Sequence, residues 1–109
     1  MNIGPEITVP SNFVGDGVVL DLPIVSNPMI VQVQANDPDD AILTFRWTVP
    51  RATELPEITD FKTNAGDWVS VLHLPAEFVQ TGDTISCTVT DQAQPRRNQV
   101  EIIWEAEVL

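Results

Sequence analysis

Residues 42–50, ILTFRWTVP, decide the fold class of this chain. Apolar side chains occupy every second position from Leu43 to Val49, and threonine or arginine fills the positions between them. An alternation with a period of two is typical of a β-strand that buries one face and exposes the other. Pro50 ends the segment, since proline lacks the N–H group that a strand ladder needs. The segment is therefore predicted to be a strand with Trp47 on its buried face.

The same alternation recurs along the chain, and helical spacing is scarce. Strong segments lie at residues 29–35, 68–74, 84–90 and 99–108, and shorter ones at 7–9, 18–22 and 57–61. The segments and the turns between them predict an all-β sandwich of two antiparallel sheets with seven to eight strands. One helical turn is expected at 75–79. Because 109 residues is the length of one domain, we expect a single domain over 1–109 with a short N-terminal segment, 1–5.

The inward positions of the strongest strands form the expected core. These positions hold Val31, Val33, Phe45, Trp47, Ile85, Cys87, Val89 and Trp104. On the strand at 68–74 we place Leu72 and Leu74 inside. Trp68 is then a lid over the core, whereas the opposite register would expose it as a binding anchor. Cys87 is the only cysteine, so no intrachain disulfide is expected and the thiol should act as a small buried hydrophobe.

The charge of the chain excludes two classes of partner. Acidic residues outnumber basic ones by 16 to 5, which gives a formal charge of −11. Nucleic acid requires clustered Lys and Arg, and an anionic membrane surface repels an acidic chain. The first residues have neither the basic start nor the apolar run of a signal peptide. The chain is therefore expected to act without classical secretion or to be a piece of a longer secreted protein.

Four aspartates are the best candidates for a metal site: Asp37, Asp39, Asp40 and Asp91. The two loops that carry them are expected at the same end of the sandwich, and calcium prefers such carboxylate oxygens. Aspartates also hydrogen-bond the backbone of turns. Three basic residues expected at that end, Lys62, Arg96 and Arg97, would neutralise them without a metal. We favour this second interpretation and expect no cofactor.

Nothing in the sequence indicates an active site. His73 is the only histidine, and no serine or cysteine stands at a recognisable catalytic spacing from it. Glu101, Glu105 and Glu107 alternate on one side of the last strand, where a solvated charged face is expected. The sequence therefore predicts a protein that is not an enzyme.

Two segments resemble the immunoglobulin-like domains of bacterial and phage proteins, in particular those of the polycystic-kidney-disease (PKD) type. The matching patterns are NDPD at 36–39 before LTFRW at 43–47, and VTD at 89–91. Trp47 takes the place of the tryptophan on the third strand of such folds, and Cys87 that of the sixth-strand member of the bridging pair. Val31 or Val33 stands where the partner cysteine would be, so the bridge is absent. The resemblance implies an immunoglobulin-like sandwich.

The resemblance also implies a recognition or display module. We expect a virion protein, a decoration of a phage head or tail on the virion surface, whose partner is the capsid or tail assembly. The residues expected to contact that partner are Lys62, Arg96, Arg97 and Ile103. The alternative is a spacer or carbohydrate-binding module of a longer secreted adhesin or polysaccharide-degrading enzyme, which would be extracellular and meet a cell-surface glycan.

Overall fold

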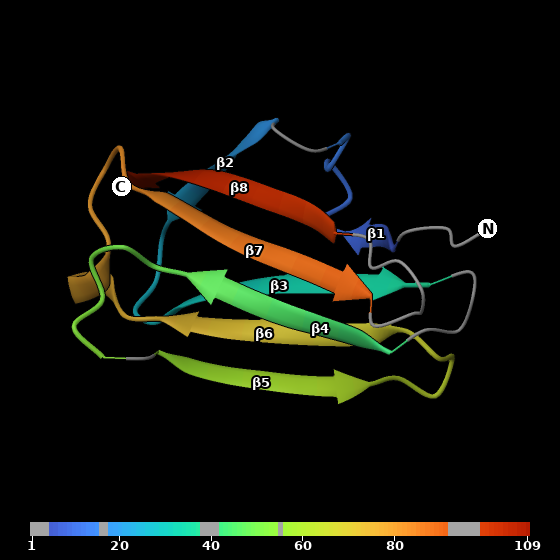
Figure 1. Cartoon of the computed structure of the whole chain (residues 1–109). Helices are drawn as coiled ribbons and strands as arrows, with labels where there is room; N and C mark the ends of the chain where they lie inside the picture. Colours follow the sequence, from blue (N-terminus) through green and yellow to red (C-terminus); the bar gives the residue numbers. More distant parts are fainter. Residues whose placement is uncertain (1–4, 16–17, 38–41, 55, 92–98) are drawn as a thin grey trace.

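The described residues form eight strands and one short 3-10 turn (Figure 1). The computed structural model describes residues 5–15, 18–37, 42–54, 56–91 and 99–109. The strands are β1 (Glu6–Val9), β2 (Val19–Ile24), β3 (Met29–Asn36), β4 (Leu43–Thr48), β5 (Glu57–Lys62), β6 (Trp68–Leu74), β7 (Thr84–Asp91) and β8 (Gln99–Val108). The turn η1 (Ala76–Phe78) falls within the helical turn expected at 75–79.

Two four-stranded sheets pack face to face (Figure 1). One sheet has the order β1-β3-β6-β5 and the other the order β2-β8-β7-β4. With β1 and β2 taken as two halves of a first strand, this is the strand order of an immunoglobulin constant-type domain. The all-β sandwich expected from the sequence is confirmed. The single cysteine is free, so packing and hydrogen bonds hold the described strands together.

One strand pair corrects the expectation of two antiparallel sheets. β2 runs parallel to β8, with Val19 opposite Ile103 and Ile24 opposite Val108. The chain keeps its direction as it passes from β1 in the first sheet to β2 in the second, and β8 runs the same way. All other pairs are antiparallel. β2 also continues across Pro23, which is tolerated because β2 is an edge strand.

The two sheets enclose one hydrophobic core. The predicted core residues other than Phe45 are buried in it, with exposed fractions of 9% or less: Val31, Val33, Trp47, Ile85, Cys87, Val89 and Trp104. Trp47 and Trp104 stack with ring centroids 5.7 Å apart, within the range that aromatic pairs favour. Leu72 and Leu74 are fully buried, as the register chosen for β6 predicts.

Phe45 is a correction to the predicted core. Its side chain packs against the core but is only partly buried. β4 is the last strand of its sheet, and at Phe45 its inner face lines an open hollow, although Leu43 and Trp47 on the same face are buried. Alternation along β4 gives Phe45 the inward direction, but it does not show that the strand next to it is missing.

A two-pronged ion pair ties the loop after β4 to the turn before β7. The Arg51 guanidinium donates through Nε to Asp83 Oδ2 at 2.7 Å and through Nη2 to Asp83 Oδ1 at 2.9 Å. The backbone N–H of Gln80 also donates to Asp83 Oδ2. The Arg51 hydrogen bonds, followed by that from Gln80, lower the pKa of Asp83 from 3.8 to about 2.

We expect this contact to stabilise the fold at neutral pH and to fail in acid. A carboxyl whose folded-state pKa is depressed adds stability above its unfolded pKa of 3.8 and loses it as pH falls through about 2. The measurement is the free energy of unfolding of wild type and Asp83→Asn by urea, near neutral pH and near pH 2. The difference between the two proteins should shrink in acid. A difference that stays constant would show that ionisation of Asp83 contributes nothing.

Candidate functional site

A chain of hydrogen bonds runs from the core of the sandwich to the exposed residue Asp60 on β5. The Trp47 indole Nε1–H on β4 donates to Ser70 Oγ on β6 at 2.8 Å. The Ser70 hydroxyl in turn donates to Asp60 Oδ1 on β5. Alternation places all three side chains inward, because Ser70 lies opposite Asp60 and on the same face as Leu72. We call these residues the Trp47–Ser70–Asp60 relay.

The relay satisfies polar groups that would otherwise be costly to bury. Ser70 is fully buried and Trp47 exposes 9% of its surface. A buried donor without an acceptor costs about 1–3 kcal/mol. The Ser70 hydroxyl avoids this cost because it accepts the hydrogen bond of the Trp47 indole N–H. The relay joins the two sheets near Cys87, which lies opposite Trp47 on β7. It therefore lies near the position at which antibody domains have an inter-sheet disulfide bridge.

Asp60 also lines a hollow on the open side of the sandwich, between the edge strands β4 and β5. The hollow has a volume of about 370 Å³ and is lined by Leu43, Thr44, Phe45, Asp60, Phe61 and Trp68. We call it the β4–β5 hollow. Asp60 is the one charged residue among these lining residues, and the remainder are mainly aromatic or aliphatic. The volume lies within the range of about 300–1,000 Å³ typical of ligand sites.

Trp68 lines this hollow and already contacts a cation of the same chain. Lys62 Nζ lies 5.1 Å from the centroid of the Trp68 ring. Register explains the contact, because Lys62 is directly opposite Trp68 in the β5–β6 pair. Trp68 is partly buried and packs against the core, as expected for a lid. Its ring therefore serves both the core and the hollow.

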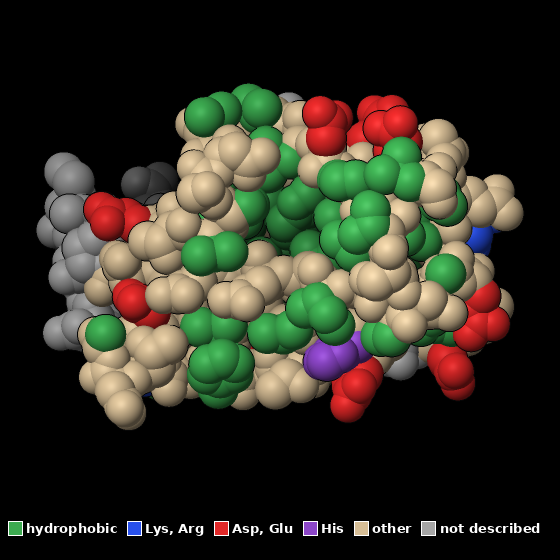
Figure 2. All heavy atoms as spheres, turned by 180° about the vertical axis from the view of Figure 1, so that it is seen from behind, with side chains coloured by type: hydrophobic (Ala, Val, Ile, Leu, Met, Phe, Trp, Pro, Cys, Tyr) green, Lys and Arg blue, Asp and Glu red, His purple; other side chains and the backbone are tan. Residues whose placement is uncertain are grey.

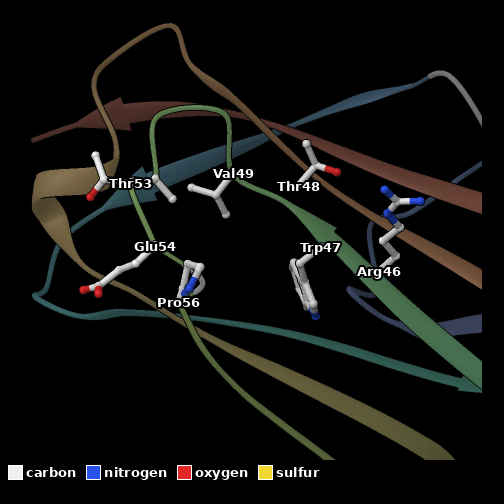
Figure 3. A pocket seen from close by; sticks show the side chains of 8 residues that line it. Arg46, Trp47, Thr48, Val49, Thr53, Glu54 and Pro56 are labelled. Carbon is white, nitrogen blue, oxygen red and sulfur yellow. The ribbon is translucent and has the colours of Figure 1, made fainter.

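A second hollow of about 380 Å³ lies further along the same open side (Figure 3). It is lined by Arg46, Trp47, Thr48, Val49, Ala52, Thr53, Glu54 and Pro56, from β4 and the loop that follows it. In Figure 3 the Arg46 and Glu54 side chains lie at opposite ends of the group, with Trp47 between them. The hollow offers separated charges and two hydroxyls, but its lining holds no histidine or cysteine that could activate a nucleophile.

The calcium candidates are divided between described and undescribed positions. Asp37 exposes 8% of its surface and Asp91 none. Asp37 follows β3 directly and Asp91 is the last residue of β7, and these two strands finish at the same end of the sandwich (Figure 1). Asp39 and Asp40 lie outside the described residues. Within the described ranges, no group of three or more His, Cys, Asp or Glu side chains could hold a metal ion. Calcium binding stays a minor hypothesis from the sequence.

Two of the four residues predicted to contact a partner, Lys62 and Ile103, lie among the described residues. Lys62 is exposed, and its ammonium group is engaged with Trp68. Ile103 is half-buried, because it lies between Ser86 of β7 and Val19 of β2 on the outer face of its sheet. Arg96 and Arg97 lie outside the described residues. Whether these four residues form one contact surface therefore stays a prediction.

The two other groups weighed as catalytic candidates lie on outer faces. His73 Nδ1 is 3.9 Å from the exposed Glu57 carboxylate on the outer face of the first sheet. Figure 2 shows His73 there among hydrophobic side chains, with acidic groups nearby. Glu101, Glu105 and Glu107 are exposed along β8, as a solvated face requires. In the part of the chain that the structure describes, no helix is long and apolar enough to cross a membrane.

Cys87 is enclosed and its thiol is held neutral. The residue is fully buried, and burial, followed by repulsion from the Asp60 carboxylate, raises the pKa of the thiol far above its ordinary value. We expect a thiol reagent near neutral pH to label Cys87 only when the protein unfolds, since the thiolate is the reactive form. Labelling of native protein and of protein in urea would be followed over time. Rapid labelling of the native protein would contradict the structure.

The relay and the β4–β5 hollow were not found by sequence analysis. Ser70 and Asp60 are polar residues at inward positions of their strands, and this departure from the apolar pattern was the available signal. It did not show which partner each side chain meets. The hollow depends on which strands are edges, and that property belongs to the whole topology.

Comparisons with known proteins add a likeness of fold. No protein-family model matches the chain, and no curated protein matches it. Among solved structures, a nucleoside hydrolase-related hypothetical protein from Saccharophagus degradans, described as associated with carbohydrate metabolism, is similar with a TM-score of 0.54 and 17% sequence identity. The likeness covers 97% of this chain and 26% of that chain. This chain therefore spans about a quarter of the length of that protein.

Proposed function

We propose that this chain is a non-enzymatic structural and display module that positions its neighbours within a larger assembly. The observation that carries the proposal is where the sandwich begins and ends. Glu6 at the start of β1 pairs with Asn36 at one end of the molecule. Val108 near the end of β8 pairs with Ile24, at the opposite end (Figure 1). A body 43 Å long and about 25 Å across would thus separate whatever is joined at its two ends.

The charge pattern supports display. The chain has a formal charge of −11, and the exposed glutamates of β8 place part of that charge on an outer face. Like charges repel, so they keep neighbouring copies soluble and apart at high density. A module carried in many copies on one surface benefits from this property.

The assembly that we propose first is a virion, on whose surface the module would decorate a head or tail. Its support is the resemblance of residues 36–47 and 85–91 to phage and bacterial immunoglobulin-like domains, together with the acidic charge. Binding to purified phage particles would be measured by co-sedimentation at rising salt. Docking through charge should weaken as the Debye length falls from about 10 Å to about 3 Å. Absence of binding at low salt would contradict the virion role.

A second candidate is a spacer or carbohydrate-binding module of a longer secreted bacterial protein. The likeness to a quarter of a protein described as associated with carbohydrate metabolism favours it, as does the aromatic lining of the β4–β5 hollow. Pull-down on insoluble cellulose, chitin and xylan tests carbohydrate binding. Retention on one of these solids at high salt would favour this candidate over the virion.

Both candidate functions require the module to separate what is joined at its two ends, and this spacing role can be tested by itself. Two copies would be joined in tandem by a short linker and compared with the single chain by small-angle X-ray scattering. Joining at opposite ends predicts a maximum dimension close to twice the 43 Å length of one copy. A tandem protein folded back side by side, with a maximum dimension close to that of one copy, would contradict the spacing role.

A further inference from the structure

We propose that the β4–β5 hollow is a binding site for a lysine or arginine side chain of a partner protein. The hollow combines one carboxylate, that of Asp60, with aromatic and aliphatic walls that include Phe45 and Trp68. An organic cation with an alkyl stem matches both parts. The stem would cover the apolar wall, and the charged head would meet the carboxylate and the ring face.

The carboxylate is fixed in place before a ligand arrives. Asp60 Oδ1 accepts a hydrogen bond from Ser70, whose hydroxyl is itself held by the Trp47 indole. Within the residues that the structure describes, no other hydrogen bond to this carboxylate is formed, so Oδ2 remains for a ligand. A charge-assisted hydrogen bond to a preoriented carboxylate is stronger than one between neutral groups. The relay therefore orients the one charge of the site.

The aromatic wall already attracts a cation. Lys62 Nζ lies 5.1 Å from the Trp68 centroid, a distance at which the ring quadrupole attracts an ammonium group. Lys62 lies two residues after Asp60 on the same face of β5 and opposite Trp68, although it is not among the residues that line the hollow. An incoming cation would share the Trp68 ring with Lys62, and the two positive charges would repel. Lys62 is thus expected to weaken the binding that Asp60 promotes.

Charge complementarity selects a basic partner and argues against a second copy of this chain. With a formal charge of −11, the protein attracts basic surfaces over a range of about one Debye length. The chain has five Lys and Arg residues against 16 acidic ones, so another copy is a poor source of the cation. A basic side chain on a different protein of the assembly fits better. This inference rests on the proposed display role, because the assembly supplies that partner.

The test uses small probes, so that the site is examined without the assembly. Nα-acetyl-lysine methylamide is titrated into the ¹⁵N-labelled full chain, and its neutral Nζ-acetylated form serves as the control ligand. We expect saturable shifts of the amide signals of Asp60, Phe61 and Trp68 with the charged probe and none with the neutral one. Equal shifts with both probes, or shifts elsewhere alone, would overturn the site. A negative result in this titration would reject the binding site alone, because the tandem scattering and co-sedimentation experiments test the display role separately.

Three variants separate the site from general electrostatics. Asp60→Asn keeps an acceptor for Ser70 and should weaken the charged probe about tenfold, the range of a hydrogen bond to a charged group. Glu57→Gln removes the same charge from the same strand, where the side chain is 76% exposed and away from the hollow, and should leave affinity unchanged. Lys62→Met should tighten binding by about threefold, since it frees the Trp68 ring face.

The directions of these effects decide the matter. Equal weakening by Asp60→Asn and Glu57→Gln would show that net charge, and not the hollow, attracts the probe. If Lys62→Met binds the charged probe more weakly than wild type, Lys62 assists binding and does not compete with the probe for the Trp68 ring. That result would reject the proposed site. If Asp60→Asn unfolds, the wild-type titration and the Lys62→Met variant still decide between these outcomes.

Discussion

Replacing Trp47 by alanine should reduce the free energy of unfolding by about 3–5 kcal/mol, the usual range for a large aromatic residue in a core. Three contacts are lost together: burial between the sheets, stacking on Trp104, and the indole hydrogen bond to Ser70. Urea denaturation followed by circular dichroism provides the measurement.

A matched control for Trp47→Ala is Trp68→Ala, which removes the same side chain from a partly buried lid position. The loss in that variant should be clearly smaller. Point mutations in general cost about 1 kcal/mol. If Trp47→Ala costs less than this, Trp47 is not the centre of the sandwich.

Replacing Ser70 by alanine should cost about 1–3 kcal/mol, the penalty of a buried donor that loses its acceptor. The change removes one atom from a fully buried side chain and leaves the Trp47 indole N–H in an apolar core. Asp60 loses its hydrogen bond as well, so affinity for a cationic probe should fall together with stability. Both quantities can be measured on the same variant.

The control for Ser70→Ala is Ser86→Ala, on the outer face of β7, where the side chain is half-buried. That variant should change the free energy of unfolding by no more than about 0.5 kcal/mol, as is usual for surface substitutions. If Ser70→Ala has the same free energy of unfolding as wild type, a water molecule or a shifted side chain replaces the Ser70 hydroxyl. The relay would then not contribute to the stability of the fold.

Local alternation was sufficient to predict the strands and most of the core. The inward positions of β7 and β8, such as Cys87 and Trp104, follow directly from a period of two. The same rule gave Phe45 the right direction and the wrong degree of burial. Burial depends on how many strands cover a position, and alternation within one strand carries no information about its neighbours.

The remaining features depend on contacts between segments far apart in the sequence. The parallel pairing of β2 with β8 arises because the chain changes sheets after β1. The relay joins positions 47, 60 and 70 from three strands. The β4–β5 hollow exists because two edge strands lie on the same side of the sandwich. None of these pairings is encoded by the period of a single strand.

The hydrogen bond from Trp47 to Ser70 joins the two sheets and, through Ser70, orients Asp60 in the candidate site. Hydrogen exchange of the Trp47 indole N–H, followed by NMR, tests it most directly. We expect this proton in wild type to exchange as slowly as the buried backbone amides of β7. The Ser70→Ala substitution should accelerate its exchange more than that of those amides. Fast indole exchange in the wild-type protein, or equal exchange in both proteins, would show that Ser70 does not hold the Trp47 indole.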